Sequence, residues 1–72
     1  MTPRELLEQA SRTIETDPEM TAFVLRDIPD LPDPLHNLTW SMSQHGCHRN
    51  EARWLCEEIE KELDEREGKV TA

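Results

Sequence analysis

Five prolines divide this chain of 72 residues into short segments, and they limit its possible folds more than any other feature. A proline lacks a backbone N–H donor, and the residue before it is pushed out of the helical conformation. We therefore expect a helix to end before Pro18 and the segment "DIPDLPDP", residues 27–34, to form an extended linker. Proline is nevertheless favourable at the first position of a helix. The pattern thus predicts helix starts at Pro3, Pro18 and Pro34.

Polar residues stand directly before these helix starts and can cap them. Thr2 is followed three residues later by Glu5, which is the spacing of a capping box. Asp17 and Asp33 each precede a proline and can accept a hydrogen bond from the first helical turn. Gly46 suits the left-handed conformation that often ends a helix, and a further helix can follow it. We predict helices over residues 3–16, 18–26, 34–45 and from residue 48 or 50 to 67.

Apolar side chains recur at helical spacing in these four segments, which indicates one buried face for each helix. The expected faces are Leu6, Leu7, Ala10 and Ile14; Met20, Phe23 and Val24; Leu35, Leu38 and Met42, with Thr39 at the edge; and Ala52, Leu55, Cys56, Ile59 and Leu63. In the linker, Ile28 and Leu31 are expected to touch the core, with a fully exposed linker as the alternative. No segment alternates as a strand would. The predicted fold class is all-α, a small helical domain of three to four helices with a C-terminal antiparallel helical hairpin.

Size and charge restrict what this domain can bind. We expect one domain over residues 1–67 and a frayed C-terminal tail over residues 68–72. Sixteen acidic residues and eight basic ones give a net charge of −8, which argues against nucleic acid or an anionic membrane as a ligand. The same charge favours a protein partner with a basic surface. No signal segment or membrane span is recognisable, so a cytoplasmic location with reduced thiols is expected.

The stretch "HGCHRNEARWLC", residues 45–56, contains the candidate metal ligands. Zinc needs four ligands around one ion, whereas a helix over most of this interval would separate Cys47 from Cys56 by roughly 13 Å. A disulfide needs Cα atoms within about 7 Å, so the same spacing disfavours it. We therefore interpret the stretch as a turn that leads into a helix, with no metal and no cofactor. Zinc binding by His45, Cys47, His48 and Cys56, or by a set that includes His36, is the alternative.

Residue patterns that would support catalysis are sparse. The chain has two glycines and no glycine-rich phosphate loop. Cys47 has histidines nearby in sequence, but no group that would orient one of them as a base. The last helix presents carboxylates where a DNA-reading helix needs basic or amide side chains. We expect a protein that is not an enzyme and that does not bind nucleic acid.

The two tryptophans provide the most useful clue to function. Successive helical residues are rotated by about 100°, which places Trp54 about 160–200° from the centre of the apolar face of its helix. Trp40 falls nearly opposite the apolar face of the preceding helix. Either other helices cover these rings, or at least one ring is exposed and anchors a partner, as tryptophan often does. The predicted partner-binding residues are Trp54, Trp40, Arg53, Glu58 and Lys61.

The apolar face of the last helix also resembles a short coiled-coil seam, because its residues follow a 4-3-4 spacing. This pattern leads to the prediction of a homodimer. The predicted self-association residues are Ala52, Leu55, Cys56, Ile59 and Leu63, and the alternative is that they belong to the core of one chain.

Together these observations favour a small acidic regulator without catalytic activity. It would inhibit or modulate a larger protein by occluding part of its surface, as small inhibitors encoded by bacteria or phages do. Two alternatives belong to other classes. One is a helical interaction module stabilised by zinc. The other is a DNA mimic that competes for the basic groove of a nucleic-acid-binding protein.

Overall fold

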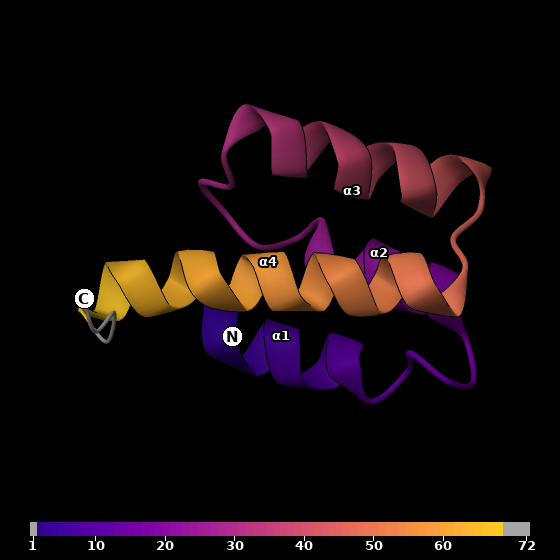
Figure 1. Ribbon diagram of the computed structural model, residues 1–72, viewed down its shortest axis with the longest axis horizontal. Helices are drawn as coiled ribbons and strands as arrows, with labels where there is room; N and C mark the ends of the chain where they lie inside the picture. Colours follow the sequence, from indigo (N-terminus) through magenta and orange to yellow (C-terminus); the bar gives the residue numbers. More distant parts are fainter. Residues whose placement is uncertain (1, 69–72) are drawn as a thin grey trace.

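Four helices make up the computed structural model, which describes residues 2–68 (Figure 1). They are α1 (Pro3–Ser11), α2 (Pro18–Leu25), α3 (Asp33–His45) and α4 (Arg49–Glu67). No strand occurs between residues 2 and 68, and the all-α class is confirmed. Of the predicted frayed tail only Gly68 is described, and residues 69–72 lie outside the described residues.

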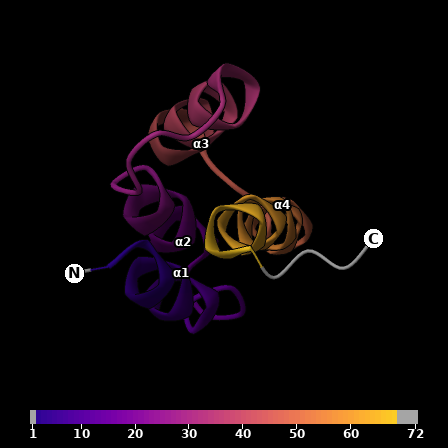
Figure 2. The same cartoon turned by 90° about the vertical axis from the view of Figure 1, so that its left-hand side faces the viewer.

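The helices are arranged so that α1, α2 and α3 follow one another in a row, while α4 lies against α1 and α2 (Figure 2). α3 and α4 run antiparallel, as a helical hairpin requires (Figure 1). However, α3 makes its most extensive contacts with α2 and not with α4. Among the packed helix pairs of the described fold, α3 and α4 have the least extensive contact. The linker between α2 and α3 contacts α4 near the C-terminal end of α4, through Arg66.

The first helix begins with the predicted capping box but is shorter than expected. The backbone N–H of Glu5 donates to Thr2 Oγ1 at 3.2 Å, and the backbone N–H of Thr2 donates to Glu5 Oε1 at 3.1 Å. The helix ends at Ser11 and not at Thr16. The hydroxyls of Ser11 and Thr13 each donate to a backbone carbonyl three residues earlier, at 2.8 Å. Side-chain hydrogen bonds of this kind favour turns over continued helix.

The other helices begin in three different ways. The carboxylate of Asp17 caps α2, as predicted, by accepting a backbone hydrogen bond of 3.2 Å from the first turn. Pro32 occupies the N-cap position of α3, one residue earlier than the Asp-Pro pattern predicts. His48 precedes α4, and its backbone N–H donates to Glu51 Oε1 at 3.1 Å. Because Glu51 completes this cap, Asn50 is not the N-cap residue.

The prediction that Met20 and Phe23 of α2 face the core is wrong. Their exposed fractions are 44% and 47%. The core-facing residues of α2 are the fully buried Thr21, Ala22 and Leu25. Two of these three side chains are small, and α2 packs extensively on both α1 and α3 with Met20 and Phe23 on its outer side.

The buried face of α3 is also rotated from the predicted one. Thr39, expected at the edge, is fully buried, whereas Leu38, expected in the core, is 38% exposed. The hydroxyl of Thr39 donates to the backbone carbonyl of Leu35 at 2.6 Å. Because this hydrogen bond satisfies the hydroxyl, threonine can occupy an apolar position at little cost.

The centre of the core comes from α4. Its buried residues are Ala52, Leu55, Cys56, Ile59 and Leu63, the face predicted from the sequence. All of them except Ala52 belong to one buried cluster with Leu7, Ala10 and Leu25. Gly46 and Gly68 follow α3 and α4 with φ of +110° and +73°. Gly46 ends α3 as predicted, but its ψ of 152° places it outside the left-handed helical conformation expected for it, which Gly68 adopts at the end of α4.

The linker between α2 and α3 is anchored to the core and to α4. Ile28 and Leu31 are 2% and 8% exposed, which confirms that they contact the core. The guanidinium of Arg66 donates to the backbone carbonyl of Pro29 at 3.0 Å and to that of Asp30. Asp30 has a φ of +61°, a value that lets the chain turn toward α3.

An ionic clamp joins the first turn of α1 to the last turns of α4. Arg4 Nη2 lies 2.6 Å from Asp64 Oδ1 and 2.9 Å from Glu67 Oε2. Hydrogen bonding to Asp64, and then to Glu67, raises the pKa of Arg4 above its ordinary value. Residues near the two ends of the described chain therefore lie side by side.

Candidate functional site

Both tryptophans are substantially exposed on the helical surface. Trp54 is 43% exposed on α4, and Trp40 is 37% exposed on α3. Neither ring lies on the buried face of its helix, as the helical geometry of the sequence predicts. The described ring contacts join Trp40 to His36 and Arg26, and none of them joins Trp40 to Trp54. The two tryptophans therefore belong to separate candidate surfaces.

Charged side chains near Trp54 on α4 are paired within the chain. Arg53 Nη2 lies 2.8 Å from Glu15 Oε1, and Lys61 Nζ lies 3.0 Å from Glu58 Oε2. The hydrogen bond to Glu58 raises the pKa of Lys61 above its ordinary value. The predicted residues Arg53, Glu58 and Lys61 thus form a rim whose charges are already partly compensated.

Trp40 belongs to an aromatic stack that the sequence analysis did not predict. The Cζ atom of Arg26 lies 4.2 Å from the ring centroids of both Phe23 and Trp40. Arg26 Nη1 also donates to Ser43 Oγ at 3.4 Å. His36 lies on the same helix as Trp40, with their ring centroids 6.1 Å apart. The spacing of three residues between Phe23 and Arg26 was the available signal, because such residues share a helix face.

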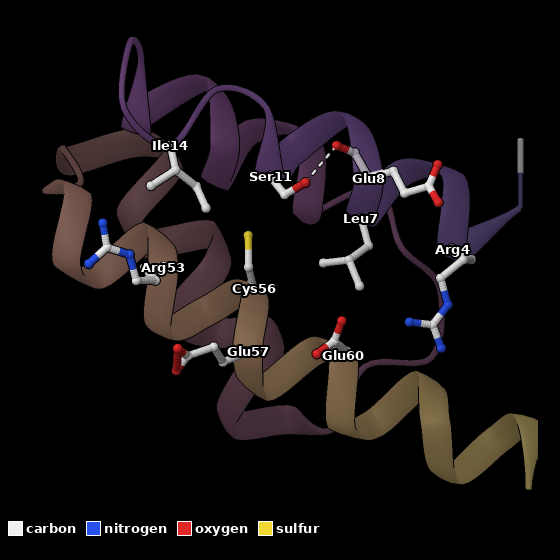
Figure 3. Close-up of a pocket in the computed structure, with 9 residues that line it drawn as sticks. All are labelled: Arg4, Leu7, Glu8, Ser11, Ile14, Arg53, Cys56, Glu57 and Glu60. Atoms are coloured by element: carbon white, nitrogen blue, oxygen red, sulfur yellow. Dashed lines mark hydrogen bonds between the residues drawn. The ribbon is translucent and has the colours of Figure 1, made fainter. Parts of the chain in front are cut away.

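A groove of 330 Å³ lies between α1 and α4 (Figure 3). Leu7, Ile14 and Cys56 supply its apolar part, and the thiol of Cys56 points from α4 toward α1. Its charged lining consists of Arg4, Glu8, Arg53, Glu57 and Glu60. The groove therefore combines an apolar floor with ionic side chains from both helices.

The two cysteines are reduced and lie in different surroundings. Burial raises the pKa of the Cys56 thiol to about 11, with smaller contributions from Cys47 and nearby carboxylates. Burial also raises the pKa of Cys47, whose Sγ lies 4.0 Å from Met42 Sδ on α3. Since the thiolate is the nucleophile and the metal ligand, both shifts lower thiol reactivity near neutral pH.

The candidate zinc ligands do not converge among the described residues. His45 and His48 are exposed at either side of the turn between α3 and α4, while Cys56 faces α1. His36, the further candidate, lies beside Trp40. Between residues 2 and 68, no group of three or more His, Cys, Asp or Glu side chains has the geometry to hold a metal ion.

The residues predicted for self-association require a correction. Ala52, Leu55, Cys56, Ile59 and Leu63 are at most 8% exposed and belong to the core of a single chain. Because α1 and α2 cover this face of α4, a second chain could reach it only by displacing them. The 4-3-4 spacing therefore reflects packing within the chain.

Comparison with known proteins adds no relative from which a role could be transferred. No family model, curated protein or solved structure matches this chain. Within the part of the chain that the structure describes, no helix combines the length and apolar character needed to cross a membrane. Residues 2–68 thus form a small four-helix domain with two exposed aromatic surfaces, one shared by α2 and α3 and the other on α4.

Proposed function

We propose that this chain is a non-catalytic domain that binds another protein and modulates it by covering part of its surface. The observation that carries the proposal is the exposure of both tryptophans, 43% for Trp54 and 37% for Trp40. Truncation of a tryptophan at the centre of an interface commonly costs 2 kcal/mol or more of binding energy. Exposed aromatic rings on an otherwise charged surface are therefore natural anchors for a partner.

The setting of Trp54 supports this role. It projects from α4, which is held to α1 by the Arg4 clamp and to the linker by Arg66. A ring on a rigid helix loses little conformational entropy on binding, which favours affinity. Arg53 and its partner Glu15 are charged and solvent-accessible, as the polar rim of an interface is. The partner would cover the ring and leave this rim at the edge of the contact.

The proposal is tested by affinity capture from a cell extract, followed by titration of each purified captured protein. The variants are Trp54→Ala and Trp40→Ala, and Glu65→Gln is the control because Glu65 is also exposed on α4. We expect at least one captured protein to bind the wild-type chain and Glu65→Gln equally. The affinity of that captured protein for one of the two tryptophan variants should be about 30-fold weaker than for the wild-type chain. Helicity measured by circular dichroism checks that each variant is folded.

Modulation requires a second measurement on the same captured protein. Its own activity is measured while the chain is added, and it should change in proportion to the fraction bound. If a captured protein binds Trp54→Ala and Trp40→Ala as tightly as it binds the wild-type chain, the proposed surfaces are refuted. Binding without a change in the partner's activity would refute modulation.

A further inference from the structure

We propose that Met20, Phe23, Arg26 and Trp40 form a docking surface for a basic amphipathic helix of a partner protein. This inference rests on the proposed function and deepens it by assigning the chemistry of the partner. We call these four residues the α2/α3 patch. Met20, Phe23 and Trp40 are 44%, 47% and 37% exposed. They come from adjacent helices whose mutual contacts are the most extensive in the described fold.

The apolar part of the patch is held in place before any partner binds. Arg26 lies between the rings of Phe23 and Trp40, with its Cζ atom 4.2 Å from each centroid. Ser43 fixes the guanidinium, because Ser43 Oγ accepts from Arg26 at 3.4 Å and donates to the Trp40 carbonyl at 2.8 Å. Preorganised aromatic side chains lose less entropy on binding than mobile ones.

Negative charge lies next to these apolar side chains. A hollow of 190 Å³ is lined by Met20 and Phe23 together with Asp17, Glu19 and Ser43. The carboxylates of Asp17 and Glu19 are exposed at the N-terminal end of α2. A lysine or arginine of a partner could place its aliphatic stem against Met20 and its charge beside these carboxylates.

The charge of the chain and the all-helical fold of residues 2–68 indicate which kind of partner fits the α2/α3 patch. A second copy of this chain carries the same charge of −8, and a two-fold contact through this patch would bring like charges together. Between residues 2 and 68 there is no strand, so an extended peptide finds no sheet edge to pair with. A helix satisfies its own backbone hydrogen bonds and needs only side-chain contacts. A basic amphipathic helix therefore fits both observations.

The experiment uses a fluorescently labelled peptide of about 14 residues, composed of lysine and leucine at helical spacing. Fluorescence anisotropy measures its binding to the full chain, with a glutamate–leucine peptide as the charge control. Leu38→Ala is the matched variant, because Leu38 is an exposed apolar residue of α3, 38% exposed, that lies about 200° around the helix from Trp40 and outside the patch. We expect Phe23→Ala to weaken binding about tenfold or more, and Leu38→Ala to leave it unchanged.

A second variant tests the contribution of negative charge without changing an aromatic side chain. Glu19→Gln removes one exposed carboxylate beside the hollow and should weaken binding a few-fold at low salt, with helicity unchanged. The proposal is overturned if the lysine–leucine peptide does not bind, if the glutamate–leucine peptide binds as well, or if Phe23→Ala has no effect. Loss of binding only with Trp54→Ala also overturns it, while the proposed function would then stand at Trp54.

Discussion

Replacing Cys56 with alanine should remove a pH dependence of stability that the wild-type chain shows in alkaline solution. The thiol is 8% exposed in the core beside α1, and burial raises its pKa from the ordinary value of 9.0 to about 11. In the unfolded chain the same thiol is solvated and titrates near its ordinary value. The folded and unfolded states therefore bind different numbers of protons between these two pH values.

The sign and size of the effect follow from proton linkage. Below about pH 9 the thiol is protonated in both states, and the stability due to its burial is fully present. As the pH rises toward about 11, the unfolded chain loses the proton first, so the free energy of unfolding decreases. Each unit of difference corresponds to about 1.4 kcal/mol, which gives a total loss of about 2–3 kcal/mol across this window.

The assay is urea unfolding of wild type and Cys56→Ala under reducing conditions at several pH values from about 8 to 11. Alanine removes the thiol and leaves a small cavity, so its stability should be lower by about 1 kcal/mol at pH 8. This difference should shrink and then reverse as the pH rises, because only the wild-type chain carries the buried thiol. Subtracting the two curves cancels the titrations of other groups.

Cys47→Ala serves as the matched control. Its thiol also has a raised pKa but lies in a half-buried position, so its removal should change the alkaline slope less. Parallel pH curves for wild type and Cys56→Ala would refute the reasoning, because they would mean that the thiol is ionised in the folded chain or titrates equally in both states.

Three further substitutions test the core, a cap and the clamp by thermal or urea unfolding. Ile59→Ala should cost about 2–5 kcal/mol, because Ile59 is fully buried at the centre of the core. A loss below about 1 kcal/mol would mean that the site collapses around the smaller side chain. Thr2→Ala should cost about 1 kcal/mol, with reduced helicity, because Thr2 Oγ1 accepts from the backbone of Glu5 at 3.2 Å. Asp64→Asn should cost about 0.5–1 kcal/mol at low salt by weakening the contact with Arg4, and the effect should fade at high salt. An effect that persists at high salt would point to packing and not to charge.

The positions at which the helices begin were more predictable from the sequence than the face that each helix buries. The Asp-Pro steps and the capping box of Thr2 are local signals, and the structure reproduces the helix starts to within one residue. The face that a helix buries depends on how closely it packs against its neighbours, and this packing cannot be deduced from residue composition. Thr21 and Thr39 are both fully buried, and a sequence rule based on hydrophobicity places neither in a core.

The aromatic stack escaped prediction for the same reason. Phe23 is the only phenylalanine of the chain, and a small domain was expected to bury it. Its exposure follows from the face that α2 buries, because Thr21, Ala22 and Leu25 form that face and leave Met20 and Phe23 on the outer side of the helix. By contrast, Trp54 was correctly placed off the buried face, because the apolar face of α4 is long enough to define its orientation from the sequence.

The clamp between Arg4 and the end of α4 has a consequence for synthesis on the ribosome. The first helix emerges early, but Asp64 and Glu67, which hold it, are made about 60 residues later. Until then Leu7 lacks the α4 side chains that it packs against in the finished core. The nascent chain therefore exposes apolar surface until α4 has left the exit tunnel, and the core can close only after α4 is made.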